Sequence, residues 1–282
     1  MKSTDIVFSI IVPTISTDSI LIDLRDWFLK LDDLNCELII IDQWKVPRKK
    51  LLEAQEKNIF YFFNEIKGLS VNRNIGIKVS RGNWLIFLDD NCWFEKNYIS
   101  VAKKYFKRNP DIGIVFSKIL DEEKNNTKRV RVKRKNISLS SIDTGSAPGM
   151  IIRKDLALSK LFDENMGIGG KYGSCEEFDL VARSLEEEEI VKVNPDLVIF
   201  HPEPKNTSFN REYNYGRGHG YLTYKRLKSS NKIHLNFMFS FKRIILALLK
   251  GLLGFFQLFY NFKKGRLKIN WFIGFTKGFF RL

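Results

Sequence analysis

The chain contains few cysteines and few histidines, which excludes several kinds of site. Its 282 residues include three Cys and three His. Cys36, Cys92 and Cys175 are odd in number and widely spaced, so they suit neither a disulfide framework nor a zinc site with C-x-x-C spacing. Three scattered histidines likewise do not make a zinc site. A reducing compartment is the simpler inference for such a chain.

Two further motifs are absent. The glycine-rich segment 167–173 lacks the pattern of a P-loop, which argues against nucleoside triphosphate hydrolysis and favours a mobile loop over an acceptor. No signal peptide is visible, because the apolar stretch 6–12 is short and stops at Pro13.

In the basic segment 128–135, the Lys and Arg residues alternate with valine and not with aromatic residues, so nucleic acid is not an expected partner. An exposed strand beside an anionic lipid and a plain solvated face remain open for it.

Acidic residues are missing from the last quarter of the chain. From Tyr213 to Leu282 there are 14 Lys or Arg and no Asp or Glu, and the whole chain carries a net charge of +15. The preceding residues are therefore nearly neutral, and the tail is strongly basic. Charge confined to one segment favours a partner of that segment, such as an anionic membrane surface.

The first half of the chain alternates short apolar runs with segments of helical periodicity. We expect strands at 6–12, 37–41, 59–63 and 84–88, and helices at 19–31, 48–57 and 70–80. Apolar runs of this kind are typical of strands buried on both faces, so the order predicts a mainly parallel α/β sheet flanked by helices. Later we expect helices at 98–107 and 176–185, and strands at 112–119, 129–135, 149–152, 191–193 and 197–200.

The final 50 residues differ in character, since 11 of the 24 Phe lie between Phe237 and Phe280. The stretch 244–262 is apolar apart from one narrow helical stripe, made by Ala247, Lys250, Gly254, Gln257 and Asn261. A helix of that length is about 28 Å long, barely a bilayer span. The flanking positive charge and the lysine in mid-run favour a helix lying in the membrane interface. A single span, a packed soluble helix and an oligomer interface are the alternatives.

Four apolar residues, 85–88, run directly into Asp89, Asp90 and Asn91. A buried strand that ends in acids holds them at the sheet edge where α/β proteins bind ligands. Adjacent carboxylates repel each other unless a cation lies near them, and such oxygen ligands suit Mg²⁺ or Mn²⁺. A solvated Asp-Asn turn is the alternative.

Four segments in order resemble the glycosyltransferases of family 2, which have the GT-A fold. They are Phe8–Thr14, Gly68–Gly76 followed by Ser80–Gly82, Leu85–Asn91 and Glu176–Arg183. The resemblance runs from about Phe8 to His201. It implies a Rossmann-like sheet over residues 1–225 and transfer of a sugar from a nucleotide-diphosphate sugar. The remaining residues, 226–282, form a basic, apolar helical region that we expect to associate with a membrane.

The resemblance also implies which residues bind the donor. The nucleotide-sugar set is Pro13, Thr14, Asp42, Arg73, Asp89 and Asp90. In this reading Pro13 and Thr14 lie at the base and Asp42 accepts a hydrogen bond from a ring N–H. Arg73 stacks on the base or binds phosphate, and Asp89 faces the ribose. A capping acid at Asp42 and a surface arginine at Arg73 are the alternatives.

Residues 89–91 occupy the place of the family's metal-binding D-x-D motif. This implies an Mg²⁺ or Mn²⁺ cofactor held by Asp90 and Asn91, with His201 completing the shell. Asn91 is neutral where a third acid is commonest, so we expect Asp90 to carry more of the metal contact or the ion to bind weakly. A structural histidine is the alternative for His201. His219 lies in a glycine-rich basic segment that we expect to be flexible and able to reach a pyrophosphate.

The segment Glu176–Arg183 predicts the start of a helix, where acids are favoured by the helix dipole alone. The resemblance implies that Glu177 is the general base that takes the proton of an acceptor hydroxyl. Glu176 and Asp179 are the other candidates. Direct attack by the activated hydroxyl inverts the anomeric configuration without a covalent enzyme intermediate.

Together these features predict a membrane-associated, inverting glycosyltransferase that acts in surface polysaccharide biosynthesis. We expect a glycan acceptor, lipid-linked, and contact of residues 237–282 with an anionic membrane at the cytoplasmic face, peripheral or monotopic. One alternative is a weak or inactive sugar-nucleotide-binding scaffold, which Asn91 and Glu177 keep open. The other is a sugar nucleotidyltransferase, which the lack of a glycine-rich loop at 13–16 disfavours.

Overall fold

The structure is a computed structural model that describes residues 7–31, 35–48, 58–121, 123, 136–202 and 207–282. It consists of two compact units. Unit 1 comprises Met1–Leu161 and Arg183–Glu203, and unit 2 comprises Phe162–Ala182 and Pro204–Leu282. The helix expected at 48–57 and the strand expected at 129–135 fall outside the described residues.

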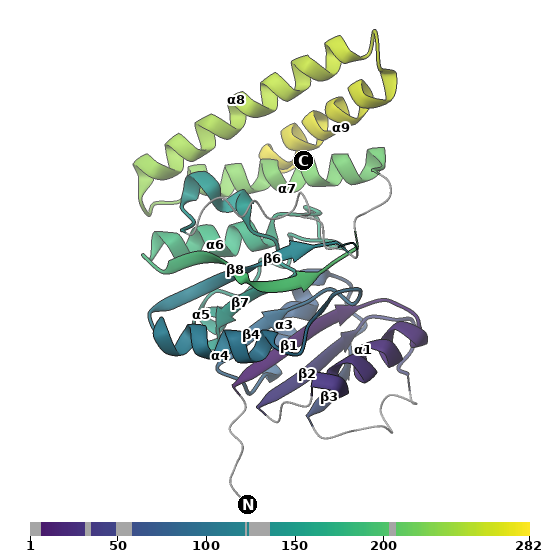
Figure 1. Ribbon diagram of the computed structural model, residues 1–282. Helices are drawn as coiled ribbons and strands as arrows, with labels where there is room; N and C mark the ends of the chain where they lie inside the picture. Colours follow the sequence, from purple (N-terminus) through teal and green to yellow (C-terminus); the bar gives the residue numbers. More distant parts are fainter. Residues whose placement is uncertain (1–6, 32–34, 49–57, 122, 124–135, 203–206) are drawn as a thin grey trace, which may run out of the picture. The chain divides into compact units, whose positions relative to one another are not determined.

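Unit 1 is built on an eight-stranded sheet with the order β3-β2-β1-β4-β7-β6-β8-β5 (Figure 1). The strands are β1 (Phe8–Thr14), β2 (Cys36–Asp42), β3 (Ile59–Phe63), β4 (Trp84–Phe87), β5 (Trp93–Phe94), β6 (Ile112–Leu120), β7 (Met150–Arg153) and β8 (Ile190–Phe200). Strand β1 pairs in parallel with β2 and β4, and β2 pairs in parallel with β3. Strand β7 runs antiparallel to β4 and β6.

The apolar runs predicted as strands at 6–12 and 37–41 form buried strands, since every residue of β1 and β2 is buried. The two late strands expected at 191–193 and 197–200 are instead one strand, β8. Its parallel pairing with β6 shifts register between Ser117 and Lys118, opposite Asn194 and Val198. The interruption follows from Pro195, which has no N–H to donate to the ladder.

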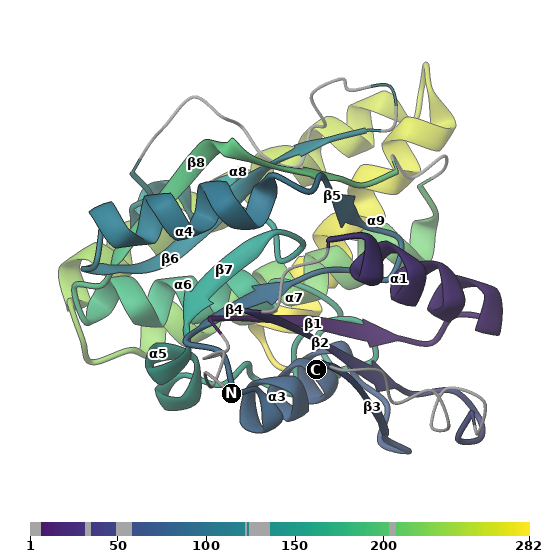
Figure 2. The same ribbon diagram turned by 60° about the horizontal axis from the view of Figure 1, so that its bottom comes forward.

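Helices cover both faces of this sheet. They are α1 (Asp18–Leu31), α3 (Leu69–Val79), α4 (Tyr98–Arg108) and α5 (Lys154–Ser159), with a short 3₁₀ helix, η1 (Leu139–Thr144). Figure 2 shows α1 and α4 on one face and α3 and α5 on the other. The apolar stripe expected on α1 is buried, and it consists of Leu21, Leu24, Phe28 and Leu31.

The strand order places a topological switch point between β1 and β4. The chain runs outward from β1 through β2 to β3 and then returns to β4 on the other side of β1. Gly82 allows this return, because a Cβ there would lie 2.7 Å from the backbone of Phe8 and Ser9. Ligands of open α/β sheets bind at the carboxyl ends of strands beside such a point, which here are Thr14 and the residues after Phe87.

Unit 2 holds the start of α6 (Glu176–Glu186) and three long helices, α7 (Phe209–Lys228), α8 (Ile233–Gln257) and α9 (Phe262–Phe279). Gly216 and Gly220 of α7 lie against the backbone of α9, and Gly274 and Gly278 of α9 lie against the backbone of α7. Glycines four residues apart share one face of a helix and let two backbones approach closely.

Two predictions from the sequence concern unit 2: a flexible segment around His219 and a domain end at residue 225. The segment around His219 is an ordered part of α7 and not a flexible stretch, because its glycines pack against another helix. Residue 225, where we placed the end of the catalytic domain, lies within α7, and that division stays a prediction. Among the described helices, none is long and apolar enough to cross a membrane.

Candidate functional site

A tight turn follows β4 and carries the acidic residues of the motif. The N–H of Cys92 donates to the carbonyl of Asp89 at 3.0 Å, which closes a four-residue turn. Asp90 and Asn91 form its corner, and Asn91 is exposed. The turn therefore brings the first and fourth residues together and directs Asn91 into solvent.

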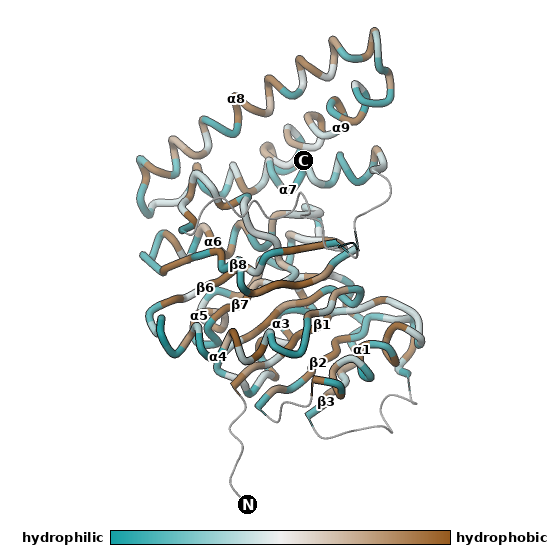
Figure 3. Tube along the Cα trace, viewed as in Figure 1, coloured by the Kyte–Doolittle hydropathy of each residue, from teal (hydrophilic) through white to brown (hydrophobic). Residues whose placement is uncertain are grey.

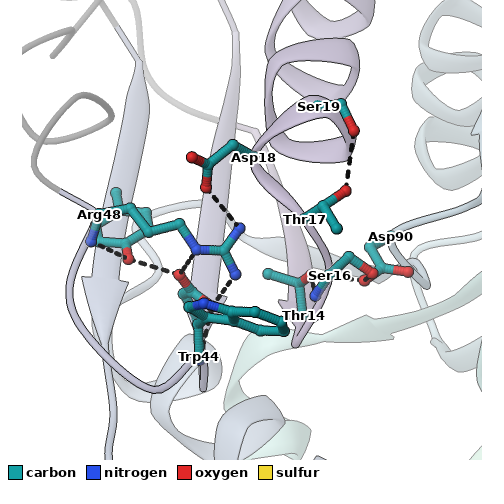
Figure 4. Close-up of polar contacts among 10 residues, drawn as sticks. Thr14, Ser16, Thr17, Asp18, Ser19, Trp44, Arg48 and Asp90 are labelled. Atoms are coloured by element: carbon teal, nitrogen blue, oxygen red, sulfur yellow. Dashed lines mark hydrogen bonds and ion pairs between the residues drawn. The ribbon is translucent and has the colours of Figure 1, made fainter.

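Asp90 connects the ends of the two strands at the switch point. The hydroxyls of Thr14 and Ser16 both donate to its Oδ2 atom, each at 2.5 Å, as Figure 4 shows. The N–H of Ser16 donates to the Thr14 hydroxyl at 2.9 Å, which holds the turn after β1. Pro13 lies within β1 and is buried. The carboxyl ends of β1 and β4 thus form one hydrogen-bonded edge.

Asp42 ends β2 opposite Thr14 and is fully buried. Its Oδ2 accepts from the Tyr61 hydroxyl at 2.6 Å and lies 3.0 Å from Arg48 Nε. Its Oδ1 accepts from Arg48 Nη2 at 3.0 Å and from the Trp44 N–H at 2.9 Å. Both carboxylate oxygens are engaged, so a nucleotide base reaches Asp42 only if Arg48 or Tyr61 moves.

Arg48 itself is buried and makes a second ion pair with Asp18 at 3.3 Å (Figure 4). Its guanidinium carbon lies 5.1 Å from the ring centroid of Trp44, which is partly exposed. Burial and the hydrogen bond to Asp42 raise the pKa of Tyr61 to about 12, so its hydroxyl keeps the proton that it donates. This buried group fixes the end of β2.

Arg73, on α3, is almost completely buried and faces the same edge. Its Nη2 atom lies 3.5 Å from Asp89 Oδ1. The other oxygen of Asp89 lies 3.5 Å from His201 Nε2, directly after β8. Asp89 therefore joins Arg73 and His201, and the contact of Arg73 with a base or phosphate stays a prediction.

One group of described side chains has the donor atoms of a metal site: Asp89, Cys92 and His201. One ligand atom from each lies within 4.8 Å of the others, and Cys92 and His201 are buried. Carboxylate and imidazole fit a divalent cation such as Mn²⁺, whereas a thiol does not suit Mg²⁺. The predicted metal-binding set of Asp90, Asn91 and His201 stays a prediction. In this structure His201 contacts Asp89, and Asp90 accepts hydrogen bonds from two hydroxyls.

The candidate base residues begin helix α6 in unit 2. Asp179 is fully buried and forms ion pairs with Lys225 at 2.9 Å and Arg226 at 3.3 Å, both from α7. That arrangement suits a structural carboxylate. Glu176 is buried and Glu177 is partly exposed, and the base role of Glu177 stays a prediction.

The entry into α6 is strained. Cys175 immediately precedes the helix with φ of 68°, in the left-handed region that residues with a side chain rarely adopt. The Ser174 hydroxyl donates to the Tyr215 carbonyl at 3.2 Å, which ties this segment to α7. Burial raises the pKa of the Cys175 thiol, so this cysteine is held neutral. Strain of this kind is concentrated at functional positions.

His219 is half-buried among the helices of unit 2. Arg243 of α8 donates to its Nδ1 atom, and its ring centroid lies 5.5 Å from that of Trp271. Burial, and then the charges of Arg243 and Lys250, hold the pKa of His219 well below its usual value. It is a neutral packing residue within its unit.

Sequence reasoning missed three residues of the unit 1 edge: Ser16, Arg48 and Cys92. Ser16 had a local signal, since serine two residues after a strand-ending threonine is typical of a turn. Cys92 also had one, because the fourth residue of a turn returns toward the first. Arg48 had none, as its contact with Asp42 depends on the course of the chain after β2.

The chain is similar to known glycosyltransferases. The profile of Glycosyl transferase family 2 matches residues 9–163, more than half of the chain. An uncharacterized glycosyltransferase of Haemophilus influenzae is 21% identical over 276 residues, which cover 89% of each protein. Glycosyltransferase GlyA of Streptococcus pneumoniae is 25% identical over 111 residues, and these cover 16% of that longer protein.

Two solved structures share the fold. S. aureus TarS 1–349 in complex with UDP superposes with a TM-score of 0.65 at 14% identity, over 96% of this chain and 90% of that chain. The mannosyltransferase PcManGT from Pyrobaculum calidifontis, in complex with GDP-Man and Mn²⁺, gives a TM-score of 0.65 at 12% identity, over 97% and 87%. The GT-A fold expected from the sequence is confirmed. The chain therefore belongs to Glycosyl transferase family 2 and is a glycosyltransferase.

Proposed function

We propose that the protein transfers a sugar, with inversion, from a nucleotide-diphosphate sugar to a hydroxyl of a lipid-linked glycan. The observation that carries the donor assignment is the edge at the switch point, where Asp90 accepts from Thr14 and Ser16 and Asp89 lies between Arg73 and His201. Fold relatives have been solved with UDP, UDP-GlcNAc and GDP-Man, which supports a nucleotide-sugar donor.

The chemistry is a single displacement at the anomeric carbon. The acceptor oxygen forms a bond to that carbon, the bond from the carbon to the diphosphate oxygen breaks, and the nucleoside diphosphate leaves with the electron pair. Glu177 takes the acceptor proton as general base. Attack opposite the leaving group inverts the configuration. A divalent cation held by Asp89 and His201 would supply positive charge beside the diphosphate.

The acceptor class is inferred from helix α8, whose polarity is reversed. Apart from Phe239, its buried residues are small or polar, namely Asn236, Ser240, Ala247 and Gly254. Most of its exposed residues are large and apolar, and Leu249, Leu252 and Phe256 are each more than half exposed. Figure 3 shows hydrophobic residues recurring along the whole helix. Burying such a face in lipid is favoured by roughly 25 cal/mol per Å².

The lysine in the middle of α8 belongs to the inward face. Lys250 lies 3.6 Å from Glu212 of α7 and 3.9 Å from the ring centroid of Trp271. Burial lowers the pKa of Lys250. The outward face is therefore free of this charge, while Lys242, Lys263 and Lys264 are exposed near it and suit anionic headgroups. We accordingly propose peripheral attachment to the cytoplasmic face of the cell membrane and a role in surface polysaccharide synthesis.

The donor assignment is tested by thermal denaturation with UDP-, GDP-, CDP- and dTDP-sugars in the presence of Mn²⁺. A ligand that binds only the folded state raises the melting temperature with the logarithm of its concentration. We expect one nucleotide class to raise it in the wild type and to lose that effect in Asp90→Ala. An unchanged melting temperature with every donor would contradict the proposal. The stereochemistry is read from the anomeric proton of the first product by NMR.

Membrane attachment is tested by flotation of the full-length protein with liposomes that contain anionic lipid. We expect the wild type to float and the triple variant Leu249→Glu, Leu252→Glu, Phe256→Glu to remain at the bottom. The matched control places the same charges on exposed apolar residues of unit 1, as Ile15→Glu, Ile22→Glu, Ile66→Glu. A wild type that does not float, or a control that sinks equally, would remove the membrane claim.

A further inference from the structure

We infer that Cys92 is a ligand of the cation site and that the site prefers a thiophilic or borderline cation, such as Zn²⁺ or Co²⁺, over Mg²⁺. The role of such a cation beside a diphosphate rests on the proposed function. Its binding by these side chains does not, and can be measured without donor or acceptor.

The first argument is the orientation of the His201 ring. Its Nδ1 atom lies 2.6 Å from the carbonyl oxygen of Pro202, and a carbonyl only accepts, so Nδ1 carries the proton. The other ring nitrogen, Nε2, faces Asp89 Oδ2 at 3.5 Å, so an imidazole nitrogen and a carboxylate oxygen lie side by side.

The second argument is that this arrangement matches the surroundings of a metal-bound histidine. Such a ligand usually donates its other ring N–H to a carbonyl or carboxylate, which orients the ring and fixes the tautomer. Two ligands of a tetrahedral zinc ion lie about 3.4 Å apart, close to the spacing of the Asp89 and His201 atoms. Backbone geometry supports the same placement, since the His201 N–H donates to the Leu120 carbonyl at 2.9 Å.

The third argument is the position of Cys92. The turn closed by its N–H returns it to Asp89, and its side chain is 2% exposed. Its sulfur belongs to the same group of atoms within 4.8 Å. On metal binding the thiol proton passes to solvent, and the thiolate charge offsets the guanidinium of Arg73, which lies 3.5 Å from Asp89.

The donor set decides the type of cation. Mg²⁺ requires oxygen ligands in near-octahedral geometry, whereas thiolate with imidazole and carboxylate suits Zn²⁺ and Co²⁺. Three protein ligands leave one position of a tetrahedral ion open. A phosphate oxygen of the donor can occupy that position. In this chain Cys92 thus serves as a ligand in place of the neutral Asn91.

The inference is tested by titrating the full-length wild type with Co²⁺ alone, under a non-thiol reductant. We expect a thiolate-to-cobalt charge-transfer band in the near ultraviolet, which about a hundredfold excess of Mg²⁺ leaves in place and Zn²⁺ removes. Cys92→Ser should abolish the band and weaken Co²⁺ binding by at least about tenfold. His201→Asn should weaken binding and keep the band. Cys175→Ser is the matched control, because Cys175 is equally buried and should leave the band unchanged.

If Cys92→Ser does not fold, a measurement on the wild type can test the inference instead. X-ray absorption of the zinc-loaded protein should show one sulfur neighbour at about 2.3 Å. A shell of nitrogen and oxygen alone, ready displacement by Mg²⁺, or no Co²⁺ binding would overturn the inference. The last outcome would mean that His201 simply pairs with Asp89. Sugar transfer that persists in that case leaves the proposed function standing.

Discussion

The two units place polar and apolar residues in opposite ways. In unit 1 the core is apolar, and polar side chains gather where strands end, as at Thr14, Asp42 and Asp89. In unit 2 the long helices bury polar and small residues, such as Asn236 and Gly274, and α8 exposes most of its apolar ones. In the proposed function, the polar strand ends of unit 1 bind the donor and the apolar face of α8 meets the membrane.

The largest expected effect separates donor binding in unit 1 from acceptor activation in unit 2. Removal of a general base costs about 10² to 10⁴ in rate, so Glu177→Gln should lower kcat by that factor. Donor affinity should not change, because the proposed donor-binding residues lie in unit 1. The measurement is steady-state transfer combined with donor titration.

Glu176→Gln, on the adjacent buried residue, is the matched control and should keep most of the activity. If Glu177→Gln retained the full rate while Glu176→Gln or Asp179→Asn lost it, the base would be assigned to the wrong residue.

The next effect concerns a buried charge in unit 1. Arg48→Ala leaves the carboxylate of Asp42 buried beside Tyr61 without its cation, and breaking such a pair costs about 3–5 kcal/mol. The measurement is urea denaturation followed by circular dichroism. Arg25→Ala, in the exposed pair with Asp26, should cost about 0–1 kcal/mol. A small loss for Arg48→Ala would show that Asp42 is open enough to meet a base directly.

A third prediction tests the close approach of helices in unit 2. Gly278 of α9 lies against the backbone of α7 at Arg217, so Gly278→Val must separate the helices and should cost about 3 kcal/mol. Fluorescence of Trp271 reports on unfolding of this unit, because the other four tryptophans lie in unit 1. Thr276→Val, on the same helix but partly exposed, should change stability little. Equal effects would mean that the glycine contact is not required.

The smallest effect is the pH dependence of unit 2. The pKa of His219 in the folded protein lies below its unfolded value of about 6.5, so the unfolded state takes up a proton first as the pH falls. Its contribution to stability is complete above pH about 6.5 and is lost below it, amounting to about 1.4 kcal/mol by pH 5.5. Urea midpoints of Trp271 fluorescence at pH 7.5 and 5.5 measure this loss. His219→Gln should remove this loss of stability at pH 5.5. If the variant loses as much stability as the wild type between pH 7.5 and 5.5, another group is responsible.

The contrast between the units also explains what the sequence predicted. In unit 1 the apolar runs at β1 and β2 and the acids after β4 follow the ordinary rule of apolar inside and polar at strand ends. That rule located Thr14, Asp42 and Asp89 at one edge. It could not show that Arg48 covers Asp42, or that Cys92 returns to Asp89, because both depend on turns and on contacts between distant residues.

In unit 2 the ordinary rule fails. The stripe of Ala247, Lys250 and Gly254 has the pattern of a solvent-facing side, yet it packs inward. The glycines of α7 predict a flexible segment from sequence alone, because only a second helix reveals that Gly216 and Gly220 serve close packing. A helix reversed in this way is predicted from sequence only when its partner helices are known.

The most direct test of the account measures sugar transfer to a glycan acceptor presented either in water or on anionic liposomes. The wild type should use both, and Asp90→Ala should lose activity with both. The α8 triple variant should keep the soluble acceptor and lose the liposome-borne one. Full activity of Asp90→Ala, or equal use of both acceptors by the α8 variant, would contradict the division into a donor-binding unit and a membrane-adapted unit.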